Sequence, residues 1–306
     1  MKYTRALLAL LVSLCILRVH TQSTTSPPPP RTHLRTCYLM FGPISDLGYT
    51  FSHNKGRMAA HKRFSLDFPN ITLESRYVQF AGFQTPEKQT AITQAFVDTG
   101  CEVIHGTYDT YSILKPFVEK YPNITFSTGA GGGGGWPHQP GIKYHPNLVR
   151  FERRSYQKWY QAGIVAAMTR KRCIGWIPSW MNHRTHWSVV MNHYAPMSSV
   201  SAFVLGVQSI LPNETVHILS VESWYDPDRA AVAAEALHKG LGCDILFQYS
   251  DAFEAAQYAE ANDIMSIQMH GIASEYHGDN VLTCIYSNWT SLYYNMSVDR
   301  ALGRAR

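Results

Sequence analysis

Six residues are of types suited to binding a small ligand. They are Asp46, Gly48, Tyr49, Phe51, Asp226 and Asp251. Aromatic rings stack on planar heterocycles, with about 1–3 kcal/mol per base by analogy with nucleic-acid complexes. Carboxylates accept hydrogen bonds from N–H edges and ribose hydroxyls, and glycine lets a ligand approach the backbone closely. These residue types predict reversible binding of a flat, polar molecule.

Structural alternatives to ligand binding stay open for three of these residues. Asp226 stands in Asp-Pro-Asp before an alanine-rich segment, which is also a strong helix-start signal, and Asp251 could cap the next helix in the same way. Tyr49 could pack between two parts of the fold. The alternative function is a nucleoside or glycoside hydrolase that uses Asp46, Asp226 or Asp251 as cleft carboxylates.

Short apolar runs alternate with segments of helical spacing along most of the chain. The expected strands span residues 37–42, 73–79, 102–105, 124–127, 148–151, 173–177, 216–221, 244–248, 264–268 and 281–286. The expected helices span residues 49–64, 86–98, 112–120, 156–168, 199–211, 228–240, 252–261 and 292–300. This alternation predicts parallel sheets with helices on both faces. Ligands bind such folds at the carboxyl ends of the strands, which is where Asp46 and Asp251 are expected.

The irregular stretch 129–147 divides the alternation into two runs, which predicts two lobes. The expected organisation is a signal peptide (1–22), a Pro-rich linker (23–36), a first lobe (37–128, with about 269–286 returning to it), a second lobe (129–268) and a C-terminal helix (287–306). The apolar stretch 7–17 is too short to span a bilayer and fits a secretory signal. We therefore expect a protein that is secreted or displayed at a cell surface.

Sequons and cysteines bear on the compartment. Five Asn-X-Ser/Thr sequons begin at Asn70, Asn123, Asn213, Asn288 and Asn295. Together they favour a eukaryotic secretory route, with a periplasmic protein and accidental sequons as the alternative.

The five cysteines after the expected signal are Cys37, Cys101, Cys173, Cys243 and Cys284. Their odd number leaves at least one thiol outside any internal disulfide. Because a core of this size needs no staples, we expect most of them to be small core residues.

No cofactor and no metal are expected. The glycine run 131–135 is followed by Trp-Pro rather than by Lys and a hydroxyl residue, which predicts a surface loop and not a phosphate-binding loop. His183, His186 and His193 lack the i, i+4 spacing of a helical metal pair and predict a polar loop. The formal net charge of +5 comes without a run of Lys or Arg, which argues against a nucleic-acid partner.

Three segments of the chain resemble one family. Residues 42–57 (GPISDLGYTFSHNKGR) are similar to its opening signature, residues 156–163 (YQKWYQAG) to a helix of its second lobe, and residues 223–227 (SWYDP) to its Trp-x-Asp-Pro element. This is the basic membrane protein (BMP) family of ABC transporter substrate-binding proteins, which includes PnrA-like purine nucleoside receptors and Med-like proteins. The resemblance runs from about residue 37 to about residue 300. It implies an α/β, two-lobed type I periplasmic-binding-protein fold, each lobe a parallel sheet flanked by helices.

The same resemblance adds Tyr156, Trp224 and His270 to the candidate ligand-binding residues, which makes nine in all, and it implies a function. It predicts an extracytoplasmic solute-binding protein, not an enzyme, that holds a purine nucleoside or nucleobase in an interlobe cleft. The expected partners are that small molecule and either an ABC permease or a fused or associated membrane signalling domain, with the protein itself a monomer. Family members continue past the 292–300 helix, so we expect a truncated chain or part of a longer receptor. A relative that binds nothing is a further alternative.

Three positions near the expected cleft depart from the family pattern. Trp159 stands where Arg is common, and Ser201 stands where Asn is common. The segment 268–270 (QMH) replaces a turn that carries a carboxylate. These departures bear on the identity of the ligand more than on the fold.

Overall fold

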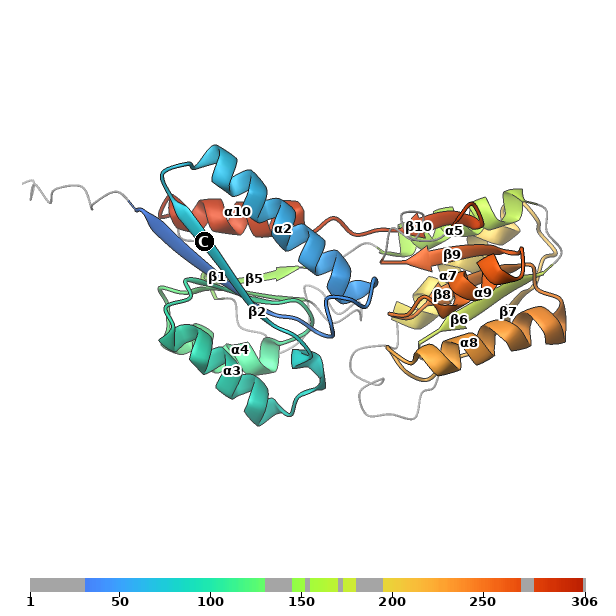
Figure 1. Cartoon of the computed structure of the whole chain (residues 1–306), viewed down its shortest axis with the longest axis horizontal. Helices are drawn as coiled ribbons and strands as arrows, with labels where there is room; N and C mark the ends of the chain where they lie inside the picture. Colours follow the sequence, from blue (N-terminus) through green and yellow to red (C-terminus); the bar gives the residue numbers. More distant parts are fainter. Residues whose placement is uncertain are drawn as a thin grey trace, which may run out of the picture. The chain divides into compact units, whose positions relative to one another are not determined.

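A computed structural model describes residues 31–129, 145–151, 155–169, 173–179, 195–270 and 278–304 (Figure 1). The expected signal peptide, most of the Pro-rich linker, the glycine run and the three-histidine segment lie outside these residues.

The first sheet has five parallel strands in the order β2-β1-β3-β4-β5. These strands are β1 (His33–Leu39), β2 (Thr72–Val78), β3 (Val103–Gly106), β4 (Thr125–Gly129) and β5 (Leu148–Phe151). All four residues of β3 are buried, and β1 is buried at five of its seven positions. Continuous burial is expected for central strands of a parallel sheet, because helices cover both faces.

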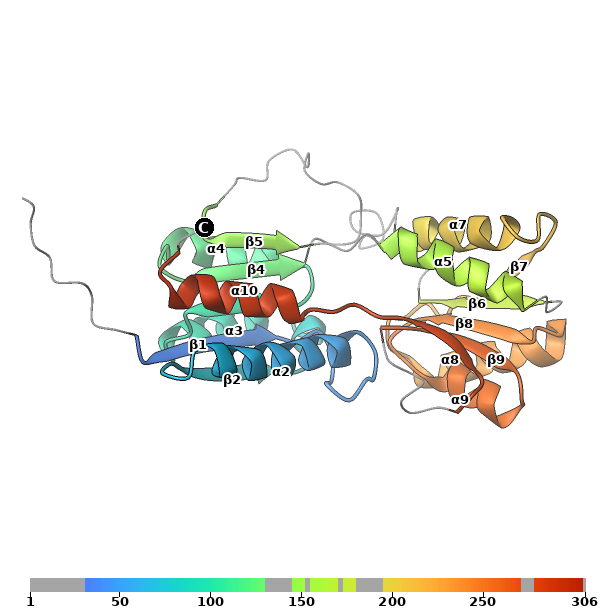
Figure 2. The same ribbon diagram turned by 90° about the horizontal axis from the view of Figure 1, so that it is seen from above.

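Helices lie on both faces of the first sheet (Figures 1 and 2). On one face, α2 (Tyr49–Asp67) and α10 (Thr290–Ala301) lie side by side and bury Phe64, Tyr293 and Met296 against the strands. On the other face, the short 3-10 helix η1 (Ala81–Phe83), α3 (Pro86–Asp98) and α4 (Tyr111–Lys120) bury Phe96, Leu114 and Phe117. We call this sheet with its helices the first lobe.

The second sheet also has five parallel strands, in the order β10-β9-β8-β6-β7. These strands are β6 (Ile174–Pro178), β7 (Val216–Ile218), β8 (Ile245–Tyr249), β9 (Met265–Met269) and β10 (Val281–Ile285). β6 and β8 are buried at every position. The alternation of strands and helices in the sequence therefore predicted both parallel sheets correctly.

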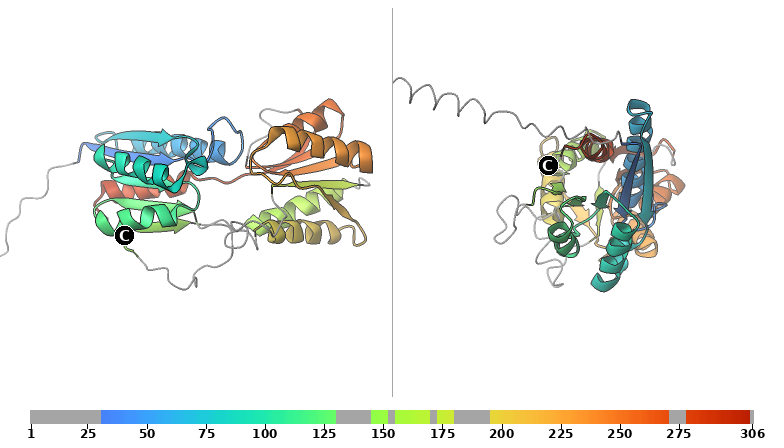
Figure 3. Two further views of the ribbon diagram at one scale, coloured as in Figure 1. Left: turned by 90° about the horizontal axis from the view of Figure 1, so that it is seen from below. Right: turned by 90° about the vertical axis from the view of Figure 1, so that its left-hand side faces the viewer.

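Two helix layers enclose the second sheet, and the sheet with its helices is the second lobe (Figures 1 and 3). On one face, α5 (Ser155–Met168) and α7 (Ala195–Gln208) bury Trp159 and Phe203 against Trp176 and Phe247 of the sheet. On the other face, α8 (Pro227–Glu235), a π-helical turn η2 (Ala236–Gly240) and α9 (Glu254–Ala261) bury small side chains and Leu237.

Three expected boundaries are wrong. β1 begins at His33, inside the segment predicted as a linker. β5 belongs to the first sheet, since Phe126 of β4 pairs with Leu148, although residues 129–268 were assigned to the second lobe. β10 pairs with β9 in the second sheet, so residues 269–286 do not return to the first lobe; the chain re-enters that lobe with α10. For β5 and β10 the pairing depends on which lobe buries the strand, because their apolar side chains complete the first and second cores respectively.

Two disulfide bonds correct the expectation that the cysteines are mostly unpaired core residues. Cys37 on β1 bonds Cys101, which stands two positions before the neighbouring strand β3. Cys173, directly before β6, bonds Cys243, which stands two positions before the neighbouring strand β8. The Cα atoms are 6.0 and 4.3 Å apart, within or close to the range that a disulfide spans. All four cysteines are also buried, so burial and pairing are not alternatives here.

Among the residues that the structure describes, no helix is long and apolar enough to cross a membrane.

Candidate functional site

The carboxyl edges of the two sheets carry most of the predicted site residues. In the first sheet, β1 lies between β2 and β3, and in the second sheet β6 lies between β7 and β8. Later strands thus flank the first strand of each lobe on both sides. Open α/β sheets bind ligands at the carboxyl end of a strand where the order reverses in this way. The loops after β1, β7, β8 and β9 contain Asp46, Trp224, Asp251 and His270.

Asp46 holds the entrance of α2. Its Oδ1 accepts hydrogen bonds from the amides of Gly48 (2.9 Å) and Phe51 (2.8 Å), and its Oδ2 accepts one from the amide of Thr50 (2.9 Å). Burial raises the pKa of this carboxyl above its ordinary value, and the three backbone donors oppose that shift. The carboxylate is 4% exposed, so its first task is to cap a helix.

Gly48 approaches Asp251 closely. A Cβ atom on Gly48 would lie 3.1 Å from Asp251 Cα and 3.4 Å from Asp251 Cβ. The sequence predicted close approach of a ligand at this glycine, whereas the structure places another backbone there. The loop after β1 and the loop after β8 therefore meet at these two residues.

Tyr49 and His270 also come together, although 221 positions separate them in the sequence. Their ring centroids are 5.2 Å apart in an edge-to-face arrangement. The Tyr49 hydroxyl donates to the carbonyl oxygen of Thr107 (2.5 Å), which follows β3. Tyr49 is half-buried and His270 is 4% exposed. An aromatic surface with one ring edge anchored by a hydrogen bond suits a planar ligand.

Trp224 and Asp226 take different places in the loop after β7. The Trp224 carbonyl accepts a hydrogen bond from the Asp251 amide (2.7 Å), and its ring lies 6.0 Å from that of Tyr249. Asp226 caps α8: its Oδ1 accepts from the Arg229 amide (3.0 Å) and its Oδ2 lies 3.3 Å from Arg229 Nε. Of the two roles considered for Asp226, the structure shows the cap.

The two other predicted aromatic residues take different places. Phe51 lies in the first turn of α2, where its amide donates to Asp46 and Lys55 Nζ is 5.6 Å from its ring centroid. Tyr156 lies near the start of α5 and is 50% exposed. The structure therefore gathers seven of the predicted residues through contacts or shared loops: Asp46, Gly48, Tyr49, Phe51, Trp224, Asp251 and His270.

Left-handed backbone is frequent at the same edges. Leu47, Phe80, Glu222 and His270 have φ between 49° and 68°, a region that non-glycine residues rarely adopt, and Asp263, with φ 53°, lies before β9 at the opposite edge. They follow β1, β2, β7 and β9 respectively, all at carboxyl ends. Such conformations persist where the surroundings over-determine them, and they are frequent at ligand sites.

Residues after β3 were missed by the sequence analysis. Thr107 is fully buried, its hydroxyl donates to the Leu39 carbonyl (2.9 Å), and its carbonyl holds Tyr49. The Tyr108 ring lies 5.5 Å from that of Phe41, and burial raises the pKa of its hydroxyl. Both residues directly follow a strand that the sequence did predict, so the strand-end criterion that found Asp46 would have found them.

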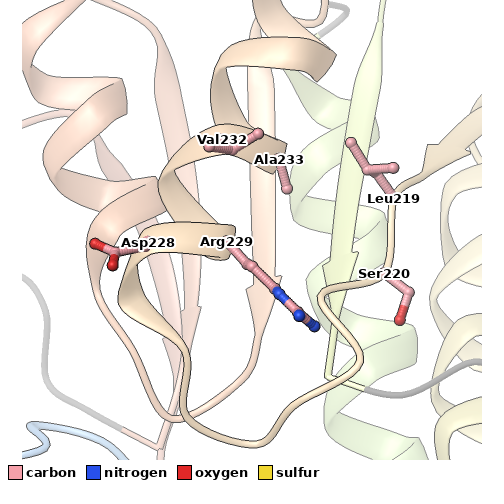
Figure 4. A pocket seen from close by; sticks show the side chains of 6 residues that line it. All are labelled: Leu219, Ser220, Asp228, Arg229, Val232 and Ala233. Carbon is pink, nitrogen blue, oxygen red and sulfur yellow. The ribbon is translucent and has the colours of Figure 1, made fainter.

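A small pocket lies away from these residues, on the second lobe (Figure 4). It has a volume of about 280 Å³ and lies between the loop after β7 and α8. It is lined by Leu219, Ser220, Asp228, Arg229, Val232 and Ala233. Leu219 and Val232 make it largely apolar, and none of the nine predicted residues lines it.

A family comparison agrees with this geometry. The family described as ABC transporter substrate-binding protein, PnrA-like, matches residues 35–304, which is most of the chain and includes both lobes.

Curated relatives differ in the ligands that their names state. A putative ABC transporter glucose-binding protein of Haloferax volcanii is 24% identical over 264 residues, 85% of this chain and 59% of its own length. A purine-binding protein of Brucella abortus is 26% identical over 272 residues, 88% of this chain and 68% of its own length. A metabotropic glutamate receptor-like protein of Dictyostelium discoideum is 24% identical over 83% of this chain, which spans only 30% of that protein.

Solved structures share the fold. An ABC transporter solute-binding protein of Aeropyrum pernix superimposes with a TM-score of 0.67 at 14% identity, over 89% of this chain and 72% of its own. This likeness confirms the predicted two-lobed α/β fold with parallel sheets and helices on both faces.

Proposed function

Since the chain belongs to the PnrA-like family of ABC transporter substrate-binding proteins, we propose that it binds a small solute reversibly at the carboxyl edges of its two sheets. The observation that carries this proposal is the meeting of Tyr49 with His270 and of Gly48 with Asp251. Residues of both lobes thus contribute to one group. Relative motion of the lobes about their connections would open and close such a site.

We propose a purine nucleoside or nucleobase as the ligand. The site is rich in rings, with Tyr49, His270 and Trp224 at the strand ends and Phe41 6.4 Å from Tyr49. A planar base gains stacking energy from such rings. The name of the Brucella relative supports a purine, and the name of the Haloferax relative makes glucose the competing ligand.

The capping roles of two carboxylates weaken the hydrolase alternative. Asp46 accepts hydrogen bonds from three backbone amides. Asp226 accepts one from the backbone amide of Arg229 and forms an ion pair with the guanidinium of the same residue. A general acid or nucleophile needs an oxygen directed at the substrate.

The partner that we propose is an ABC permease or a membrane signalling domain, and the compartment is extracytoplasmic.

Calorimetry with adenosine, guanosine, inosine, their bases and glucose tests the ligand. We expect heat from at least one purine and none from glucose. Tyr49→Ala should weaken purine binding about 5- to 150-fold, which corresponds to about 1–3 kcal/mol of stacking. Tyr49→Phe keeps the ring and loses only the bond to Thr107, so it should bind better than Tyr49→Ala.

Tyr160→Ala is the matched control, because Tyr160 is 39% exposed on α5 and belongs to no part of the proposed site. Silence across the purine panel would refute the purine assignment, and binding of glucose alone would replace it. Chromatography of the nucleoside after incubation with the protein should return it unchanged; cleavage would favour a hydrolase.

A further inference from the structure

Asparagines that precede the strands, at the amino-terminal edges of the sheets, fall into two sets. One set lies directly before β5 and β10, at Asn147 and Asn280. The other lies two or three positions before β2, β4 and β7, at Asn70, Asn123 and Asn213. The two sets differ in burial, in hydrogen bonding and in the residues that follow them.

The first set is structural. Asn147 Nδ2 donates to the carbonyls of Val118, Tyr121 and Ile124 at 3.1–3.2 Å, and Asn280 Nδ2 donates to those of Ala259 and Ile264 at 3.4 and 3.1 Å. Both residues are half-buried, and neither begins a sequon. Their amide nitrogens are committed to the fold.

The second set faces solvent. Asn70, Asn123 and Asn213 are all exposed, and each begins an Asn-X-Thr sequon. No hydrogen bond is recorded for their side chains in the described part of the chain. Each lies in a short connection that leads into a strand, so a bulky group on the amide would displace no core contact.

The disulfides point independently to an oxidising compartment. Cys37–Cys101 lies in the first lobe and Cys173–Cys243 in the second. Disulfides form and persist in secreted and extracellular proteins and in the lumen of the secretory pathway, where sequons are modified.

We propose that Asn70, Asn123 and Asn213 carry N-linked oligosaccharides. In the transfer, the side-chain amide nitrogen bonds to the anomeric carbon of an oligosaccharide carried on a polyisoprenyl pyrophosphate. The bond from that carbon to the pyrophosphate oxygen breaks, the amide loses a proton, and the lipid pyrophosphate leaves. The sugars then cover the amino-terminal edges of both sheets, and the carboxyl edges stay open.

Two further sequons lie outside the proposal. Asn288 Oδ1 accepts a hydrogen bond from the Thr290 amide (3.0 Å) at the start of α10. Asn295 lies within α10, and the hydroxyl of its sequon residue Ser297 is buried against the Tyr293 carbonyl (2.8 Å).

The test is expression of the full chain in insect or mammalian cells, followed by treatment with a peptide-N-glycosidase in ¹⁸O-water and peptide mass spectrometry. We expect the enzymatic conversion of asparagine to ¹⁸O-labelled aspartate at residues 70, 123 and 213. Asn70→Gln, Asn123→Gln and Asn213→Gln should each remove one glycan-sized step in electrophoretic mobility. Thr72→Ala, Thr125→Ala and Thr215→Ala should do the same while they keep the asparagine.

Asn262→Gln is the control, because Asn262 is exposed and begins no sequon; it should leave the mobility unchanged. An unlabelled asparagine at any of the three positions overturns the assignment there. A chain that stays in the cytosol without glycans overturns the whole proposal. Ligand affinity measured before and after glycosidase treatment should agree within about twofold, since the glycans lie at the opposite edges from the proposed binding site.

Discussion

His105 is a buried histidine with a specific set of neighbours. It lies on β3, is fully buried, and its Nδ1 is 2.8 Å from the Ser127 hydroxyl. Its ring stacks on Tyr38 at 4.5 Å and meets the edge of Tyr293 at 4.6 Å. Burial lowers its pKa from the ordinary 6.5 to about 3. The folded protein therefore holds this imidazole neutral over most of the acidic range.

The sign of the pH dependence follows from this lowered pKa. Between about pH 6.5 and pH 3 the unfolded chain binds a proton on His105 that the folded chain does not bind, so the free energy of unfolding falls as the pH falls. Above about pH 6.5 neither state binds this proton, so His105 does not reduce the free energy of unfolding there. Below that pH, the free energy of unfolding falls by at most about 1.4 kcal/mol per pH unit.

His105→Gln should remove this part of the slope, because glutamine does not titrate and keeps a polar group near Ser127. Urea unfolding at pH 7, 6, 5 and 4 measures it, with wild type expected to lose stability faster than the variant toward acid. His61→Gln is the control: His61 lies on α2, is only half-buried, and its Nε2 is 2.7 Å from the Leu73 carbonyl oxygen, which a glutamine amide can also reach. Parallel curves for wild type and His105→Gln would contradict the assignment.

At the scale of the elements, α5 and α7 pack through two glycines. A Cβ on Gly163 would lie 2.1 Å from the Phe203 carbonyl oxygen, and a Cβ on Gly206 would lie 2.1 Å from that of Tyr160. Both partners are backbone atoms of the facing helix. The axes of packed helices usually lie about 8–10 Å apart, and the distance depends on the side chains between them. Glycines at the contact let the two axes come closer than larger side chains would.

Gly163→Ala and Gly206→Ala should each lower the free energy of unfolding by about 1–3 kcal/mol, because the added methyl group forces the helices apart. Gly240→Ala is the control: a Cβ there meets nothing within 4 Å, so we expect no loss and up to about 1 kcal/mol of gain. Chemical denaturation monitored by circular dichroism compares the three variants. Equal stability of all three would mean that the helices do not approach this closely.

For the whole molecule, the described part of each lobe has one disulfide, which links its first strand, or the residue just before that strand, to the segment that leads into a neighbouring strand. The bonded cysteines are 64 and 70 positions apart in sequence. Closing loops of this length removes much of the entropy of the unfolded chain, and native disulfides contribute typically about 2–4 kcal/mol. The two lobes are thus stabilised separately by the same device.

Replacing Cys37 and Cys101 by serine should lower the free energy of unfolding by about 2–4 kcal/mol, and the Cys173 and Cys243 pair should behave alike. Thermal unfolding with and without reductant checks this, and reductant should have a smaller effect on each double variant than on wild type. Cys284→Ser, which affects neither disulfide, should change the midpoint little. A wild-type midpoint that is insensitive to a reductant shown to break both bonds would refute the prediction.

Local pattern was enough to predict the parallel sheets, the helix layers and the position of Asp46 at a strand end. Apolar runs and helical spacing report which faces are buried, and a polar residue after a buried strand lies at the carboxyl edge. The same pattern did not separate the two roles of Asp226, because an acid before a helix has the same sequence whether it caps or binds.

Tertiary structure alone decided which distant segments meet. β5 joins the first sheet, β10 joins the second, four cysteines pair, and Tyr49 contacts His270 from 221 positions away. The two strand pairings depend on competition between the lobes for the same apolar strand, whereas the disulfides and the ring contact depend on the folded chain bringing distant residues together. The outcome depends on how much apolar surface area each possible partner buries. A short window of sequence does not contain that information, because the partners are distant in the chain.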